Sequence, residues 1–219
     1  MSEELFNALE KFIPSYLVNP SRDNLKRIIK EKFPKFTESK DVYSINHQNE
    51  LKQGDCLDEI PFFVINNDEN NELTTLYYSG IVLSNSCSIN PSNVRFQQSS
   101  INFAQVYPLS NYYEFLNSKK LEEEKINNHI RDIKANLVSR IIYLPELYLE
   151  EQSEVLFPES IVVLDKITTI PLSILNKYNL NFKPDGDRYF TLSNYGLLVF
   201  IFKLSVHFCR FSEYIDRDL

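Results

Sequence analysis

Glycine, histidine and cysteine are scarce in this chain, and tryptophan is absent. Its 219 residues include four glycines, three histidines and three cysteines. Four scattered glycines do not make the glycine-rich loop that cradles nucleotide phosphates, which excludes ATP, GTP and dinucleotide chemistry of that type. No Cys-x-x-Cys or His-x-x-x-His pair occurs, so the sequence predicts neither a metal site nor any other cofactor.

Apolar runs long enough to cross a membrane are missing as well. The most hydrophobic stretch, residues 197–211, is interrupted by basic and imidazole side chains and is shorter than the roughly 20 residues that a bilayer requires. Glu3 and Glu4 stand where a secretory signal would carry positive charge, and the three cysteines are far apart. We therefore expect a cytoplasmic protein with reduced thiols and no membrane association.

Basic residues are few in the middle of the chain. The formal net charge is -7, and residues 51–118 hold only Lys52 and Arg95 against seven acidic residues. Such a surface would repel a phosphate backbone unless a local basic strip were present, which disfavours nucleic acid as a partner. Three carboxylates between residues 55 and 59 have two interpretations, a hydrated sheet edge or a site for a hard cation.

Aromatic residues other than tryptophan are plentiful. The chain has 16 Phe and 13 Tyr, enough for a substantial core. Between Gly54 and Leu109, three apolar runs separated by polar turns predict the strands of a small barrel. Further strands are expected at residues 137–144, 160–167 and 188–192, and helices at residues 2–13, after Ser21, at 111–135 and at 193–211.

These elements predict an α+β fold. We expect a small distorted antiparallel β-barrel or curled sheet, crossed by one helix and closed by a buried C-terminal helix. This part forms one domain, residues 51–219, and residues 1–50 form a helical N-terminal extension that packs alongside it.

The segment from Ser84 to Cys87 directly follows the second apolar run. A turn here would present Cys87 among hydroxyl and amide groups, which makes the thiol a candidate nucleophile. A thiolate needs a neighbouring base or positive field, and the three histidines lie at no characteristic spacing from it. The alternative is that Cys87 is a small buried residue or a turn residue.

Three cationic side chains share one side of the predicted C-terminal helix. At 100° per residue, Lys203, His207 and Arg210 fall within about a third of a turn of one another. Because dehydrating them is costly, we expect them to face solvent, acidic partners such as Asp55 or Asp58, or an anionic ligand. The candidate binding residues are Asp55, Ser84, Asn85, Cys87, Arg95, Lys203, His207 and Arg210.

Three segments occur in a recognisable order: Gly54-Asp55, then Gly-Ile-Val-Leu-Ser-Asn at residues 80–85, then Phe-Ala-Gln-Val-Tyr-Pro-Leu at residues 103–109. Together they resemble the start of the MazF/PemK-like toxin family, whose members are small barrels with a Gly-Asp opening and an apolar strand that ends in Ser. The resemblance covers about a quarter of the chain and implies binding and cleavage of RNA. In that family an Arg-Pro pair before the central strand contributes to cleavage, whereas Tyr78-Ser79-Gly80 occupies this stretch here.

Residues 84–89 and 192–210 carry a second likeness. They resemble an uncharacterised bacterial family with a Ser-x-Ser-Cys-Asp-Ile-like segment after a strand and a final helix of the Leu-Ser…Lys-Leu-Ser…His-x-x-Arg type. Ser88 stands where that family has Asp. The likeness implies a setting, an accessory gene of a mobile element or of a phage-defence or toxin–antitoxin locus, and no chemistry.

The leading functional hypothesis is a non-catalytic interaction module that binds a protein partner encoded nearby. Its candidate surfaces are the acidic barrel face and the cationic stripe of the last helix. One alternative is an RNA-binding or RNA-cleaving barrel in which Arg95, Lys203, His207 or Arg210 replaces the family's missing cation. The other is a Cys-dependent hydrolase in which an imidazole activates an exposed Cys87.

Overall fold

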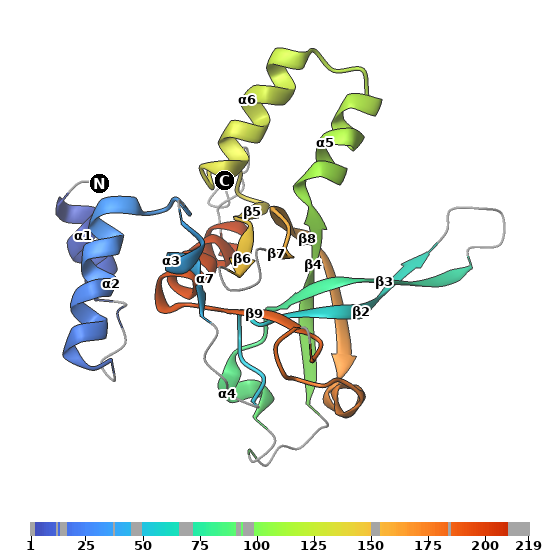
Figure 1. Ribbon diagram of the computed structural model, residues 1–219, viewed down its shortest axis with the longest axis horizontal. Coiled ribbons are helices and arrows are strands. Elements are labelled where there is room, and N and C mark those ends of the chain that lie inside the picture. The colour runs from blue at the N-terminus through green and yellow to red at the C-terminus, as the bar shows by residue number, and fades with distance from the viewer. Residues whose placement is uncertain are drawn as a thin grey trace, which may run out of the picture.

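The structure is a computed structural model that describes residues 3–11, 13, 17–36, 38–44, 50–65, 72–90, 93, 99–149, 154–183 and 185–209. Its centre is a seven-stranded antiparallel sheet with helices around it, so the predicted α+β class is confirmed (Figure 1). The two outermost strands do not pair with each other among the described residues. Of the two predicted forms, the sheet therefore takes the curled, open one.

The main sheet places strands from distant parts of the sequence side by side. Its order is β1 (Tyr43–Ser44), β9 (Arg188–Leu192), β2 (Cys56–Ile65), β3 (Leu73–Val82), β4 (Ser100–Pro108), β8 (Ser160–Pro171) and β5 (Ile141–Leu144). A separate two-stranded sheet consists of β6 (Leu147–Leu149) and β7 (Glu154–Phe157). Strands β2, β3 and β4 confirm the three predicted between residues 54 and 109, and β9 has the predicted bounds.

Helices flank this sheet and extend from it. They are α1 (Glu3–Glu10), α2 (Asn19–Lys32), α3 (Ser39–Val42), α4 (Ser86–Ile89), α5 (Leu109–Ser118), α6 (Glu123–Lys134), α7 (Asn194–Cys209) and the 3-10 helix η1 (Leu172–Lys177). The buried side chains of α2 are Leu25, Ile28 and Ile29, all of which join the main core. The N-terminal segment thus packs against the rest of the chain, whereas the division into two domains stays a prediction.

The single helix predicted for residues 111–135 is wrong, because the segment folds into two helices. Helices α5 and α6 form a hairpin that projects from the sheet (Figure 1). Between them, Lys120 has a φ of 54°, in the left-handed region that ends a helix. Neither Pro nor Gly marks this break, so the residue types that usually signal the end of a helix are missing from it. Tyr112 Oη and His129 Nε2, 3.1 Å apart, join the two helices near the middle.

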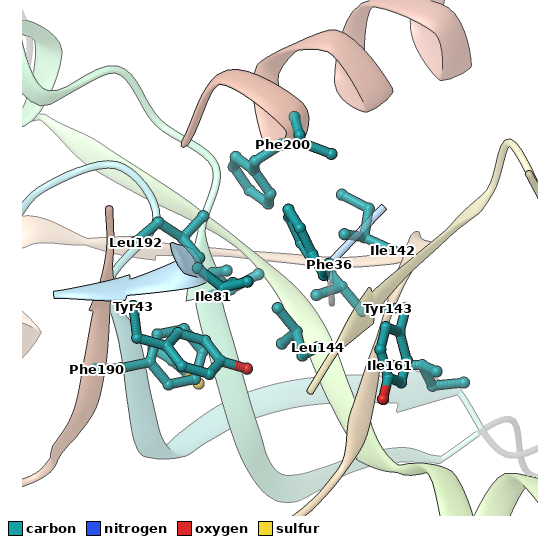
Figure 2. Close-up of a cluster of buried hydrophobic side chains, with 14 of the residues drawn as sticks. Phe36, Tyr43, Ile81, Ile142, Tyr143, Leu144, Ile161, Phe190, Leu192 and Phe200 are labelled. Carbon is teal, nitrogen blue, oxygen red and sulfur yellow. The ribbon is translucent and has the colours of Figure 1, made fainter. Parts of the chain in front are cut away.

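The main core lies between one face of the sheet and helix α7. Figure 2 shows side chains from β1, β9, β5 and α7 converging on one interior. The Tyr43 and Phe190 rings lie 4.4 Å apart between centroids, and Tyr43 Oη donates to the Pro145 carbonyl at 2.6 Å. Both rings point into the core, where they pack against each other, and the Tyr43 hydroxyl has a hydrogen-bond acceptor although it is buried.

A second, smaller core lies under η1, on strands β2, β3, β4 and β8. It contains Ile60, Phe62, Phe103 and Leu175, all buried. The Phe62 and Tyr78 rings meet edge to face at 5.9 Å. This core supplies the aliphatic wall of the cavity described below.

Helix α7 starts where the sequence predicts. Ser193 Oγ accepts a hydrogen bond from the Gly196 amide at 3.0 Å, which is the geometry of an N-terminal cap. Gly196 lies so close to α3 that a Cβ there would stand 2.3 Å from the Val42 carbonyl oxygen, so only glycine fits. Within the described residues, no helix combines the length and the apolar character needed to cross a membrane.

Candidate functional site

The corner that follows β3 holds Ser84, Asn85 and Cys87. The Asn85 side chain accepts a hydrogen bond from the Cys87 amide at 2.9 Å and thereby caps α4. Ser84 Oγ accepts one from the Asn102 amide of β4, also at 2.9 Å, which fastens the corner to the sheet. The Cys87 side chain is exposed at this corner. Two of the predicted binding residues therefore build the turn that presents the third.

A cavity of about 550 Å³ opens beside this corner. Its described lining comes from residues 50–52 before β2, from α4 with Asn90 and Asn93, from Ser99, and from η1 with Leu180. Gln53 holds two of these segments together, because its amide donates to Ser86 Oγ at 3.0 Å and its side chain donates to the Leu83 carbonyl at 2.8 Å. The volume lies within the range of about 300–1,000 Å³ that is typical of small-ligand pockets.

The described lining of this cavity contains no imidazole. His129 lies on α6 against Tyr112, and His207 on α7 lies against Asp165. His47 lies outside the described residues. The charged groups of the described lining are one ammonium, Lys52, and one carboxylate, Glu50.

Asp55 is a buried structural residue and does not contribute to an acidic surface. It is completely buried and lies 3.4 Å from the Arg188 guanidinium of β9, which is also buried. Thr191 Oγ1 donates to it at 2.7 Å and the Lys52 amide at 2.8 Å. Burial raises the pKa of the Asp55 carboxyl, while the charge of Arg188 opposes this rise. Asp55 therefore links the start of β2 to β9, and its carboxylate is not accessible to a ligand from solvent.

Asp58 is likewise held by protein groups. It accepts hydrogen bonds from Tyr189 Oη at 2.8 Å and from Lys183 Nζ at 3.2 Å. Desolvation opposes ionisation here, but these hydrogen bonds prevail and lower the pKa of the Asp58 carboxyl. Among the described residues, no group of three or more His, Cys, Asp or Glu side chains is placed to hold a metal ion.

The predicted position of Lys203 is wrong, because its side chain is buried beside the end of α6. Only 3% of the residue is exposed, and Nζ donates to the backbone carbonyls of Asn136 at 2.9 Å and Val138 at 2.5 Å. Desolvation lowers the pKa of Lys203 to about 8. Asn136 and Val138 lie just beyond the last residue of α6, and a carbonyl oxygen has two lone pairs, so the Val138 carbonyl accepts both the Ile141 amide at 3.2 Å and the ammonium group. Neither solvent nor Asp55 or Asp58 is its partner.

The rest of the cationic stripe is divided. His207 Nε2 lies 3.2 Å from the Asp165 carboxylate of β8, so this imidazole has an acidic neighbour, although not Asp55 or Asp58. Arg210 lies outside the described residues, as does Arg95. The structure thus separates the candidate residues into two places, with Ser84, Asn85 and Cys87 at the α4 corner and Lys203 and His207 on α7.

The outer halves of β2 and β3 form a two-stranded ribbon that sequence reasoning placed inside a barrel. The ribbon, defined here as residues 60–65 paired with residues 73–78, projects beyond the rest of the sheet (Figure 1). Strand β9 pairs with β2 only at Cys56 and Leu57, and β4 pairs with β3 only from Gly80 to Val82. Both outer edges of the ribbon therefore lack a neighbouring strand among the described residues.

The register of the ribbon gathers apolar side chains on one face. Because cross-strand partners share a face, the pairs Phe63 with Thr75 and Ile65 with Leu73 lie on the same side as Pro61 with Tyr77. The exposed fractions are 53% for Phe63, 62% for Ile65, 66% for Leu73 and 65% for Tyr77. The opposite face carries Ile60 and Phe62, which pack into the second core. We call the exposed side the apolar ribbon face.

One pattern in the sequence indicates this face. A strand buried on one side alternates polar and apolar residues, whereas Ile-Pro-Phe-Phe-Val-Ile at residues 60–65 is apolar throughout. Such a run predicts a strand covered on both sides, whereas the described chain covers the opposite face at Ile60 and Phe62 only, and Val64 on that face is 40% exposed. Comparison of the chain with models of protein families and with curated protein sequences finds no match to either.

Proposed function

We propose that this protein is an interaction module that binds a partner protein through the apolar ribbon face. The observation that carries the proposal is the group of four large apolar side chains, each more than half exposed, on a ribbon whose outer edges pair with no further strand in the described part of the chain. Exposed contiguous apolar surface on a folded chain is typical of protein-binding sites. Unpaired strand edges offer backbone donors and acceptors to a further strand.

The chemistry of the ribbon selects the kind of partner. Edge strands that avoid pairing carry charges or proline, and in residues 60–65 and 72–79 these are one charged side chain, Glu72, and one proline, Pro61. The complementary partner is an extended protein segment that adds as a strand, covers the apolar face with aliphatic side chains and carries basic residues toward Glu72. A phosphate backbone offers neither the strand edge nor the positive charge.

Burial of the apolar ribbon face by a partner would contribute free energy to binding. Complete burial of a Phe, Leu or Ile side chain contributes about 1.5–3 kcal/mol, and each side chain of the face has half or more of its area left to bury. Binding energy concentrates in a few aromatic anchors that are covered by the partner. Phe63 and Tyr77 are the aromatic members of the face and the expected anchors.

The two alternative functions have less support from the described geometry. An RNA-cleaving barrel requires a basic groove, and Lys52 is the only basic residue in the described lining of the cavity. A Cys-dependent hydrolase requires a base at Cys87, where the described lining has no imidazole. As part of the proposal we carry forward a cytoplasmic setting, which the cysteine usage and the acidic N-terminal residues predict. The sequence resemblance adds a phage-defence or toxin–antitoxin locus and a partner encoded nearby.

The test compares the wild-type protein with the double variant Phe63→Ser/Tyr77→Ser. Each tagged protein is expressed in its native host and purified, and any protein retained in stoichiometric amount is identified by mass spectrometry. The identified partner is then produced separately and its affinity measured by calorimetry. Loss of two aromatic anchors should weaken binding at least about 30-fold, the effect of removing roughly 2 kcal/mol.

A matched control is Leu137→Ser/Tyr148→Ser, which removes two exposed apolar side chains, 66% and 45% exposed, outside the ribbon. The proposal requires that the control retains the partner with unchanged affinity. It fails if the ribbon variant binds the partner as well as the control does, or if wild-type protein retains RNA in place of a stoichiometric protein.

A further inference from the structure

The cavity beside α4 is a second, independent feature with the properties of a binding site. Its aliphatic wall belongs to the second core: Ile89 and Leu175 are buried there, and Leu51, Leu172 and Leu180 pack against it. Because this wall is anchored in packed core, the cavity is preformed, and none of its described lining residues belongs to the ribbon. A preformed apolar wall binds a ligand without the cost of ordering it.

The rim of the cavity is rich in uncharged hydrogen-bonding groups. Three carboxamides and two hydroxyls belong to the described lining, from Asn90, Asn93, Asn176, Ser99 and Ser173. Each carboxamide has an oxygen that accepts and a nitrogen that donates. The Asn93 nitrogen donates within the rim, to the Cys87 carbonyl at 2.5 Å, so the Asn93 oxygen and the Asn176 carboxamide are the groups that we expect to meet a ligand. This is the pairing that a peptide bond requires, since its carbonyl accepts and its amide donates.

The charges of the described lining and its lack of aromatic side chains restrict the class of ligand further. Glu50 and Lys52 contribute one charge of each sign, so the described lining has no net charge and does not favour a phosphate. None of the described lining residues is aromatic. Nucleobases bind single-strand sites by stacking on aromatic rings, so their main recognition element is missing from this part of the cavity.

We propose that this cavity binds a short peptide segment of no net charge, with one branched aliphatic side chain seated against the wall of Leu175 and Ile89. The backbone of the peptide exchanges hydrogen bonds with the carboxamides of the rim. The site is separate from the apolar ribbon face, so either proposal stands if the other fails.

The cysteines of the chain provide the assay. Cys87 lines the cavity and is exposed, Cys209 is exposed on α7, and Cys56 is completely buried. The alkylation rates of Cys87 and Cys209 by iodoacetamide are measured by mass spectrometry, with and without the capped tripeptide acetyl-Ala-Leu-Ala-amide. Peptide in the cavity should protect Cys87, whereas Cys209 serves as the internal reference. At ten times the dissociation constant, the rate at Cys87 should fall about tenfold, because only the unoccupied protein reacts.

Two further probes test the ligand chemistry. Acetyl-Ala-Asp-Ala-amide keeps the peptide bonds but places a charge where the aliphatic group is expected, and uridine monophosphate offers a base and a phosphate. Neither should slow alkylation of Cys87 at the concentration where the leucine peptide does. Equal protection by either of them contradicts the assignment.

Variants of the rim locate the effect. Ser173→Phe places a ring in the cavity from an exposed position and should abolish the protection, and Ser110→Phe, also exposed but on α5, should leave it unchanged. Asn176→Ala removes one exposed carboxamide and should weaken protection several-fold even if Ser173→Phe does not fold. The proposal is overturned if the leucine peptide gives no protection of the wild-type protein, or if protection survives in both rim variants. The ribbon variant Phe63→Ser/Tyr77→Ser should retain full protection, which separates this outcome from the proposed function.

Discussion

Lys203 allows a quantitative test of the electrostatics of the interior. Desolvation lowers its pKa from 10.5 to about 8 in the folded protein, and the ordinary value returns on unfolding. Between these two values the unfolded chain binds more protons than the folded chain, so the free energy of unfolding rises with pH. One pKa unit corresponds to about 1.4 kcal/mol, so this group should add roughly 2.5 kcal/mol to the free energy of unfolding between pH 7 and pH 10.

The measurement compares urea unfolding of the wild-type protein and of Lys203→Met at pH 7, 8, 9 and 10. Other groups also differ between the folded and the unfolded protein near this range. Tyr43 is one of them, because burial raises its pKa well above 10 in the folded protein. These groups are shared, so they cancel in the difference between the two proteins. The variant also loses the hydrogen bonds to the carbonyls of Asn136 and Val138, but that loss does not depend on pH. Only the slope of the difference is therefore interpreted.

A wild-type advantage that increases with pH, by about 2.5 kcal/mol at pH 10, is the expected result. A flat or decreasing difference would show that the two carbonyls hold the ammonium form against desolvation, and the reasoning about Lys203 would be wrong. Titration of the Lys203 side chain by NMR gives an independent answer, with an expected midpoint near pH 8.

Three further predictions concern stability, measured by urea unfolding. Asp55→Asn should cost about 3–5 kcal/mol because Arg188 loses its buried counter-charge, and adding Arg188→Met should recover part of that loss; a double variant as unstable as the single one contradicts this. Gly196→Ala should cost about 1–3 kcal/mol, since its Cβ would stand 2.3 Å from the Val42 carbonyl oxygen, and an unchanged midpoint would refute the close approach. Phe63→Ser should cost no more than about 1.5 kcal/mol because the ring is 53% exposed, so a loss of about 3 kcal/mol or more would show that the ring is packed.

The strands and the end of the chain were predictable because local patterns determine them. Residues 188–192 alternate and are bounded by Asp and Ser, and they form β9 with the predicted bounds. Ser193 caps α7 as its position before an apolar run indicates. In these segments, local propensity and tertiary packing favour the same structure.

The errors arise where a distant segment decides the outcome. The spacing that places Lys203 on a cationic stripe is correct as helix geometry, but the Asn136 and Val138 carbonyls that accept its ammonium group are brought to it by the tertiary fold. Asp55 was expected at a surface because acidic side chains usually are, and Arg188 makes its burial tolerable. The α5–α6 break carries no Gly or Pro, and the unsupported outer half of the β2–β3 ribbon is a property of its neighbours' length.

The insertion of β9 between β1 and β2 has a consequence for synthesis on the ribosome. Strand β2 leaves the exit tunnel with a bare edge and an uncompensated carboxylate at Asp55, and its permanent neighbour is translated only after β8 and η1. At 5–20 residues per second that delay lasts about ten seconds, which is long compared with the microseconds to milliseconds in which hairpins form. The β2–β3 hairpin therefore has time to form before β9 is synthesised, and completion of the sheet waits for the docking of β9 with α7 behind it.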